Sequence, residues 1–133
     1  MTRPAVARFE VTGRDAGALQ RFYAALFDWR IQEGAKGSGF GVVERGDNGV
    51  SGVIGPARDG TRGHVTFYVE VDDLAAYLAR AEELGGKTLV TPTNVPEFNL
   101  TFAFFADPEG HVIGLSKGVL KAAGTTPSHG PPR

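Results

Sequence analysis

The 133-residue sequence contains a weak internal repeat, and this repeat constrains the fold more than any other feature. When the chain is shifted by 58 positions, residues 8–15 lie over residues 66–73, and three of the eight pairs are identical. The identical pairs are Phe9 with Phe67, Val11 with Val69 and Asp15 with Asp73. Near the end of each half, residues 52–55 lie over residues 111–114 at a spacing of 59. Because the matches mark the start and end of each half in the same order, the chain is predicted to contain two structural modules.

The pattern of the first half predicts a strand, a helix and three short strands. Residues 6–12 alternate between apolar and polar side chains, as a half-buried strand does. Asp15 is the predicted N-cap of the helix. The apolar stripe of this helix recurs at helical spacing in Leu19, Phe22, Tyr23 and Leu26. The three further strands are expected near residues 29–33, 40–44 and 50–54.

The second half predicts the same order of elements. A strand over residues 64–71 leads to a helix that is capped by Asp72 or Asp73. Gly85 and Gly86 are expected to end this helix, because glycine adopts the left-handed conformation without a steric penalty. The three further strands are expected at residues 87–90, 100–106 and 112–117.

This order of elements predicts the α+β class. Two tandem βαβββ modules would form one curved mixed sheet around a concave cavity, with the helices on the outer face. We expect a single domain whose modules are joined by a polar linker at residues 56–63. The predicted boundaries are residues 1–117 for the domain, 5–56 for module one, 64–117 for module two and 118–133 for a flexible tail.

Composition excludes several classes of protein. The chain has no cysteine, which excludes a disulfide scaffold and a cysteine-ligated zinc site. A net charge of −1 gives no electrostatic footprint for nucleic acid. No signal peptide and no apolar run of membrane-spanning length is visible. We therefore expect a cytoplasmic protein with neither nucleic acid nor a membrane as its partner.

Several motifs resemble those of one superfamily. The first half carries FEV at 9–11, RFY at 21–23 and LFDW at 26–29, and the second half carries DPEGHVIGL at 107–115. Together they resemble the modules of the vicinal oxygen chelate superfamily, which includes glyoxalases, bleomycin resistance proteins and extradiol dioxygenases. The resemblance covers residues 5–117 and implies a short two-module, glyoxalase-like member with a small-molecule pocket. It also implies a homodimer, for which the aromatic residues of the first helix and the strand after it offer surplus apolar surface.

The resemblance also implies a metal site with four inward-facing ligand positions, normally His, Gln or Glu. In this sequence those positions fall on Arg8, Gly55, Thr66 and Gly114. Arginine carries a positive charge that repels a cation, glycine has no ligand atom, and threonine is a poor ligand for a transition metal. We therefore expect no metal at these positions and no cofactor, although glyoxalase and dioxygenase chemistry in the family depends on the metal.

An atypical metal site is the alternative. His64 shares a strand face with Thr66 and has Glu10 or Glu70 as possible co-ligands for a divalent ion. The competing interpretation, which we favour, is that His64 is a polar residue at the start of a strand. His111 occupies a predicted surface turn, and His129 lies in the tail.

The alternation of side chains along strands predicts which residues line the pocket. The candidates from the sequence are Arg8, Glu10, Thr66, Tyr68, Glu70, Phe102 and Phe104. For the polar candidates, the alternatives are an ion pair of Arg8 with Glu10 or Glu70 and an anchor for a ligand oxygen. On the seventh strand, either Phe102 and Phe104 or Phe105 would face the pocket. The residues expected to face the helices are Phe9, Val11, Phe67, Val69 and Val71.

Three functions fit these observations. The first is a glyoxalase-like enzyme, a lyase, isomerase or dioxygenase that acts without metal or with an atypical metal site. The second is a protein of the bleomycin-resistance type that binds and sequesters a drug or metabolite. The third is a dimer with a vestigial pocket. A loop predicted at residues 91–99 would cover the mouth of the pocket in the first two cases.

Overall fold

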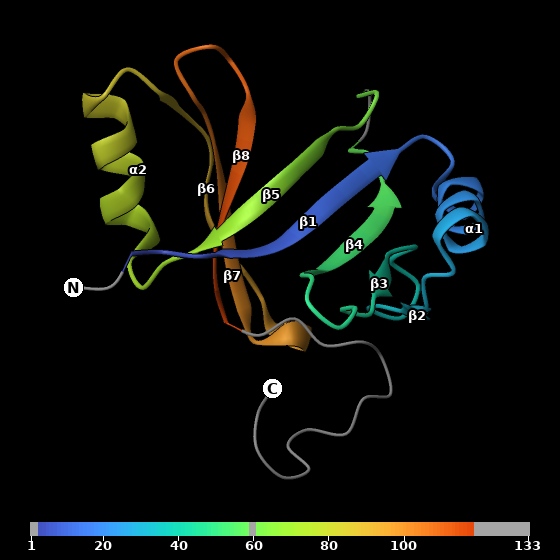
Figure 1. Ribbon diagram of the computed structural model, residues 1–133. Helices are drawn as coiled ribbons and strands as arrows, with labels where there is room; N and C mark the ends of the chain where they lie inside the picture. Colours follow the sequence, from blue (N-terminus) through green and yellow to red (C-terminus); the bar gives the residue numbers. More distant parts are fainter. Residues whose placement is uncertain (1–2, 59–60, 119–133) are drawn as a thin grey trace, which may run out of the picture.

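Both halves of the chain fold as βαβββ units in the computed structural model, which describes residues 3–58 and 61–118 (Figure 1). The elements of module one are β1 (Val6–Gly13), α1 (Ala16–Phe27), β2 (Ile31–Glu33), β3 (Gly41–Val43) and β4 (Ser51–Pro56). Those of module two are β5 (Val65–Glu70), α2 (Leu74–Glu83), β6 (Lys87–Val95), a 3-10 helix η1 (Pro96–Phe98), β7 (Leu100–Ala106) and β8 (Val112–Gly118).

All eight strands join one open sheet in the order β2-β3-β4-β1-β5-β8-β7-β6. The two first strands, β1 and β5, are antiparallel neighbours at its centre, and Phe9 lies opposite Phe67. Within each module the first and last strands are parallel, β1 with β4 and β5 with β8. The predicted α+β class, with two modules that share a curved mixed sheet, is confirmed.

Each helix begins where the sequence predicts it. The Asp15 carboxylate accepts a hydrogen bond from the backbone N–H of Ala18, and Asp73, not Asp72, does the same for Ala76. These bonds satisfy N–H groups that have no partner within the helix. In Figure 1 the two helices stand at opposite ends of the sheet, with β1 and β5 between them. No helix in the described parts of the chain is long and apolar enough to cross a membrane.

The core lies mainly in module two, under α2. Leu74 and Leu78 of this helix are buried against Val71, Ala103 and Leu115, with Val69 and Phe105 partly buried beside them. In module one, α1 has no fully buried residue. An aromatic cluster packs α1 against the sheet instead and consists of Phe9, Phe22, Tyr23, Phe27 and Trp29.

Three expectations were wrong in detail. The predicted loop at residues 91–99 is mostly strand, because β6 continues to pair with β7 as far as Val95, which lies opposite Leu100. Phe67 was expected under a helix but is 40% exposed, because the helices leave the middle of the outer face open. Gly118, assigned to the tail, ends β8, and residues 119–133 lie outside the described residues.

Candidate functional site

The concave face of the sheet encloses a cavity of about 760 Å³. Side chains from both modules and from the linker line it. This is expected because the pairing of β1 with β5 joins the two modules at the centre of the sheet. The apolar part of its wall consists mainly of Phe40, Val42, Val53, Leu89, Val90, Val95, Phe98, Leu100, Phe102, Phe104 and Val112. The polar part includes Arg8, Glu10 and Thr12 of β1 and His64 and Tyr68 of module two. A largely apolar wall with few polar groups is typical of a small-molecule site.

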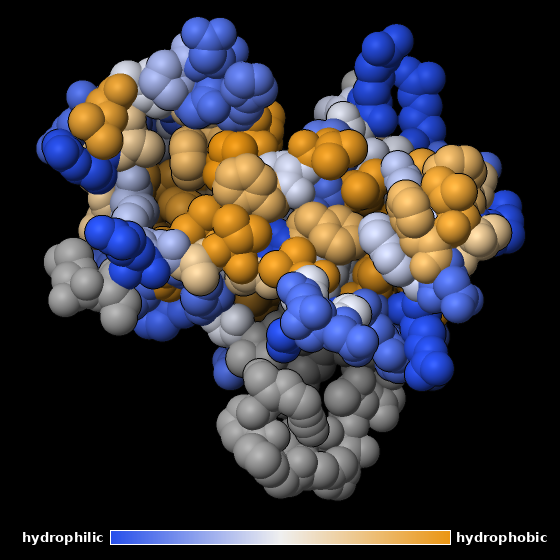
Figure 2. Space-filling model, in the orientation of Figure 1, coloured by the Kyte–Doolittle hydropathy of each residue, from blue (hydrophilic) through white to orange (hydrophobic). Residues whose placement is uncertain are grey.

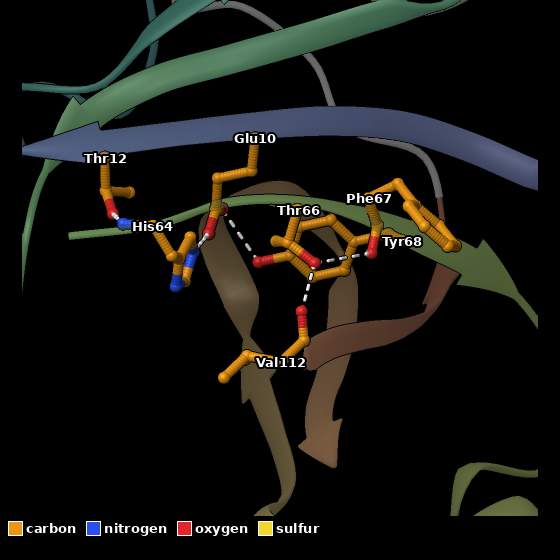
Figure 3. A network of polar contacts seen from close by, with 7 residues as sticks. All are labelled: Glu10, Thr12, His64, Thr66, Phe67, Tyr68 and Val112. Carbon is orange, nitrogen blue, oxygen red and sulfur yellow. Dashed lines mark hydrogen bonds and ion pairs between the residues drawn. The ribbon is translucent and has the colours of Figure 1, made fainter. Parts of the chain in front are cut away.

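Glu10 is the centre of the polar part of the wall. Its side chain lies between His64 and Tyr68 (Figure 3). The Tyr68 hydroxyl donates to Oε1 at 2.8 Å, and Nε2 of His64 lies 2.6 Å from Oε2. A carboxylate can only accept, so Nε2 of His64 carries the hydrogen of this bond. Glu10 is only 7% exposed, so these two donors compensate for much of the hydration that it loses.

Tyr68 is held in its protonated form. Burial is the largest cause of its raised pKa, followed by the negative charge of Glu10 and the hydrogen bond to it. The tyrosine therefore serves as a hydrogen-bond donor throughout the physiological pH range. The ring of Tyr68 has a second function, because it stacks over the Arg8 guanidinium with 4.1 Å between Cζ and the ring centroid.

Arg8 is almost completely buried, with 5% of its surface exposed. Burial lowers its pKa, and electrostatic interactions with Tyr68, Glu10 and Glu70 oppose that shift. Nη1 donates to Oγ of Ser116 at 3.3 Å, and Ser116 in turn donates to Glu70 at 3.3 Å. Of the two alternatives for Arg8, the ion pair with Glu10 or Glu70 is not formed. Glu10 pairs with His64 and Tyr68, and Ser116 stands between Arg8 and Glu70.

Two of the four positions at which the family carries metal ligands are glycines in this chain, and each glycine supports an aromatic ring. A Cβ atom at Gly114 would lie 2.4 Å from the Tyr68 ring, and one at Gly55 would lie 2.3 Å from the Phe40 ring. Both distances are shorter than real contacts, so each ring packs directly on the backbone and a larger residue would displace it. The Thr66 hydroxyl donates to the carbonyl oxygen of Val112. With the Arg8 guanidinium at the fourth position, these residues do not fit a divalent metal ion.

Comparison with protein families gives a direct match. The model of the glyoxalase-like domain family matches residues 9–116. The chain belongs to this family. The match includes both helices and all the strands except the first residues of β1, among them Arg8, and the last residues of β8.

Curated relatives of this glyoxalase-like domain share about a third of the aligned residues with it. A putative glyoxylase, CFP32, of Mycobacterium bovis is 33% identical over 83 residues, which is 62% of this chain and 31% of that protein. The anthracycline biosynthesis protein DnrV of Streptomyces peucetius is 30% identical over 139 aligned positions, which is 92% of this chain and 50% of that protein. The chain thus spans between about a third and half of the length of these two relatives.

Solved structures show the same fold at low sequence identity. A member of the glyoxalase/bleomycin resistance protein/dioxygenase superfamily from Vibrio splendidus superposes with a TM-score of 0.61 and 14% sequence identity. The aligned region covers 86% of this chain and 99% of that protein chain. Methylmalonyl-CoA epimerase of Streptomyces coelicolor, in complex with 2-nitronate-propionyl-CoA, has a TM-score of 0.60 and 15% identity, and covers 89% of this chain and 99% of its own. The assignment to the vicinal oxygen chelate superfamily is confirmed.

The glyoxalase-like domain places five of the seven sequence candidates on the cavity wall: Arg8, Glu10, Tyr68, Phe102 and Phe104. Of the alternatives on β7, Phe102 and Phe104 face the cavity and Phe105 packs toward α2. Thr66 and Glu70 do not line the cavity. Thr66 lies behind Val112, to which it is hydrogen-bonded, and Glu70 bonds to Ser116 and to the backbone N–H of Gly118.

Several residues of the site were not among the pocket candidates from the sequence. His64 was interpreted as a polar strand end, but its ring pairs with Glu10. Arg58 comes from the predicted linker, and its guanidinium lies 5.7 Å from the ring centroid of Phe104. His64 stands two residues before Thr66 on the same strand face, and this parity was the one signal that pointed to it.

A metal at His64 and Glu10 would need further ligands. This pair supplies two groups, and residues 3–58 and 61–118 contain no group of three or more His, Cys, Asp or Glu side chains that could hold a metal ion. His111 is 71% exposed in its side chain and pairs with Asp107 in the turn between β7 and β8, as a surface turn residue does.

Proposed function

We propose that this glyoxalase-like domain binds a small, largely apolar molecule that contains a flat ring, and that it does so without a metal at the four family positions. The composition of the cavity wall is the observation that carries the proposal. About 760 Å³ is a volume typical of small-molecule sites. Phe98, Phe102 and Phe104 present aromatic rings to this space, and rings favour stacked or edge-to-face contacts with other rings.

The polar cluster of Arg8, Glu10, His64 and Tyr68 supports the same proposal. These four side chains come from the two central strands and the residue before β5, so they lie together on one wall. Arginine supplies donors, and glutamate supplies acceptors. Such a cluster orients a ligand by its oxygen atoms, while the apolar wall contributes most of the buried area.

One relative is consistent with a ligand that contains flat rings, and another set of structures shows only that this fold accommodates a bound organic molecule. The Streptomyces peucetius relative is named for anthracycline biosynthesis, and the epimerase structures hold acyl-CoA compounds. Binding alone would correspond to a sequestering protein of the bleomycin-resistance type. Catalysis would make the domain a metal-free lyase or isomerase, and the Glu10–His64 pair at 2.6 Å is the observation that favours this second candidate. Turnover of a bound ligand separates the two.

A thermal-shift screen of ring-containing compounds in buffer with EDTA tests the proposal. A ligand that binds the folded state raises the melting temperature, and the stabilisation grows with the logarithm of the ratio of its concentration to its Kd. Phe102→Ala removes a ring from the cavity wall, and Phe105→Ala removes one from the other face of the same strand. We expect both variants to melt earlier, but only Phe102→Ala to lose the ligand-induced rise. A screen without any rise in melting temperature would contradict the proposal.

A homodimer and a cytoplasmic location belong to the same proposal. Apolar side chains of α1 support the dimer, because Phe22, Leu26 and Phe27 are 57%, 59% and 52% exposed. Figure 2 shows apolar side chains gathered over this helix. Exposed apolar patches of this kind are typical of protein–protein contacts.

A further inference from the structure

Arg8 stands at a position where the family carries a metal ligand, and its side chain is itself positively charged. We infer that its guanidinium binds the oxygen atom of a phenol or an enol, and that Glu10 accepts the hydrogen of that hydroxyl group. This inference rests on the proposed function, since it names the class of molecule that enters the cavity. Three features of the site support it: the contacts that fix Arg8, the hydrogen-bond donors that Arg8 has left, and the charges around it.

Arg8 is fixed from two sides. The Tyr68 ring covers one face of the guanidinium at 4.1 Å, and Oγ of Ser116 accepts from Nη1. Ser116 is fully buried and donates to Glu70, whose other oxygen accepts from the backbone N–H of Gly118. This chain of bonds orients the guanidinium before a ligand arrives, so little side-chain entropy is lost on binding.

Arg8 has donors left for a ligand. A guanidinium carries five N–H groups in one plane. Within residues 3–58 and 61–118, its side-chain hydrogen bond goes to Ser116. The contact with Tyr68 is made through the face of the guanidinium and uses none of the N–H groups. Because Arg8 lines the cavity, an oxygen atom of a ligand can accept from the groups that remain.

The charges decide which oxygen is bound. Arg8 contributes one positive charge, and Glu10 and Glu70 contribute one negative charge each, with Glu70 on the far side of Ser116. Arg58 adds a second positive charge to the cavity wall beside Phe104, while Glu10 is the carboxylate nearest to a ligand on Arg8. A carboxylate ligand would bring another negative charge toward Glu10, which is unfavourable in a buried site. A neutral hydroxyl group avoids this repulsion. Its hydrogen can point to a free lone pair of Glu10 while its oxygen accepts from Arg8.

The same arrangement allows the proton to move. The O–H bond of the ligand breaks, its electron pair stays on the ligand oxygen, and the proton forms a bond to the Glu10 carboxylate. Glu10 becomes neutral and the new anion lies beside Arg8, so the total charge of the site does not change. A phenol or enol on a flat ring therefore suits both the polar cluster and the aromatic wall of Phe98, Phe102 and Phe104.

Calorimetric titration with matched compounds tests the inference, with EDTA in all samples and in a buffer acidic enough to keep the hydroxyl group of the free naphthol protonated. The probes are 4-nitro-1-naphthol and 1-nitronaphthalene, which share ring and nitro group and differ by the hydroxyl, and 1-naphthoate, a carboxylate. We expect the unmodified chain to bind the naphthol more tightly than either of the others by about tenfold or more, the effect of one charge-assisted hydrogen bond. The visible absorption of the bound naphthol reports in addition whether its proton has moved.

Two variants assign the effect to Arg8. We expect Arg8→Met to bind the naphthol and 1-nitronaphthalene with equal affinity, so that the preference for the naphthol is lost. Arg8→Lys, which keeps the charge, should retain part of that preference. Equal affinity of the unmodified chain for the naphthol and 1-nitronaphthalene, or an unchanged preference in Arg8→Met, would overturn the inference alone. Binding of none of the three probes would count against the proposed function as well.

Discussion

Glu10 accepts a hydrogen bond from Tyr68 at 2.8 Å, and the two residues are separated by the spacing of the internal repeat, 58 positions. Equivalent positions of the two modules therefore meet on the cavity wall. The cause is the antiparallel pairing of β1 with β5, in which Phe9 lies opposite Phe67 and Arg8 lies opposite Tyr68. The repeated residues thus build the sheet. The equivalent positions that differ between the two modules, such as Glu10 and Tyr68, form the polar cluster of the site.

Tyr68→Phe should destabilise the fold. The substitution keeps the ring over Arg8 and Gly114 but leaves Oε1 of Glu10 without its donor. We expect the free energy of unfolding to fall by about 1–3 kcal/mol, the usual cost of a buried acceptor that loses its partner. Urea denaturation measures this, and Tyr77→Phe on the exposed side of α2 is the control that should change little. Equal stability of Tyr68→Phe and the unmodified chain would show that the bond is not needed.

The stability of the fold should depend on Tyr68 in alkaline solution. Burial and Glu10 raise the pKa of Tyr68 above its ordinary value of 10.0. Below that pH both the folded and the unfolded chain keep the proton, and the stabilisation is complete. Above it only the unfolded chain ionises, so stability falls by up to about 1.4 kcal/mol per pH unit from this group alone. Urea denaturation between about pH 9 and 11 should give a steeper decline for the unmodified chain than for Tyr68→Phe; parallel curves would contradict the raised pKa.

Gly114→Ala should disturb the site more than a substitution at a glycine that lies in open space. Its Cβ would lie 2.4 Å from the Tyr68 ring, so the ring must move away from the backbone and from Arg8. We expect a loss of about 1–3 kcal/mol in stability, as for other overpacked positions, together with weaker ligand binding. Gly49→Ala is the matched control, because a Cβ there meets nothing within 4 Å. If both variants behave alike in urea denaturation, the close packing of Tyr68 on β8 is not important.

The apolar surface of α1 should hold a second copy of the chain. Leu26→Glu places a charge on this surface, and Leu84→Glu places one on an equally exposed leucine just after α2. Light scattering coupled to size-exclusion chromatography should give a dimer for the unmodified chain and for Leu84→Glu, and a monomer for Leu26→Glu. A monomer in all three samples would contradict the homodimer, and a dimer in all three would exclude α1 as the interface.

Much of the fold could be predicted from the sequence, because its signals are local. Alternation along β1 and β5, the caps Asp15 and Asp73, and the apolar stripe of α2 each follow from spacing alone. The extension of β6 to Val95 could not be predicted in this way. Pro92 lies within it, and a proline normally argues against a strand; here β6 is the edge of the sheet, where a missing donor is tolerated.

Most of the candidate residues on the strands could be predicted from the sequence, but the hydrogen bonds between them could not. Strand parity placed Arg8, Glu10 and Tyr68 on the concave face, since it depends on period two alone. It gave no information on which of them bond to each other, because that depends on the register of β1 against β5 and on rotamers. His64 pairs with Glu10 across this register, from a position just before β5 begins.

The metal content of the chain is the most direct test of the account. The protein is incubated with zinc, nickel, manganese and iron(II), desalted and measured by elemental analysis. We predict no stoichiometric metal, because Arg8, Gly55, Thr66 and Gly114 offer no ligand set and two of these positions support aromatic rings. One tightly held ion per chain, lost in Glu10→Gln and His64→Gln, would contradict the account and make a metal-dependent enzyme the leading interpretation.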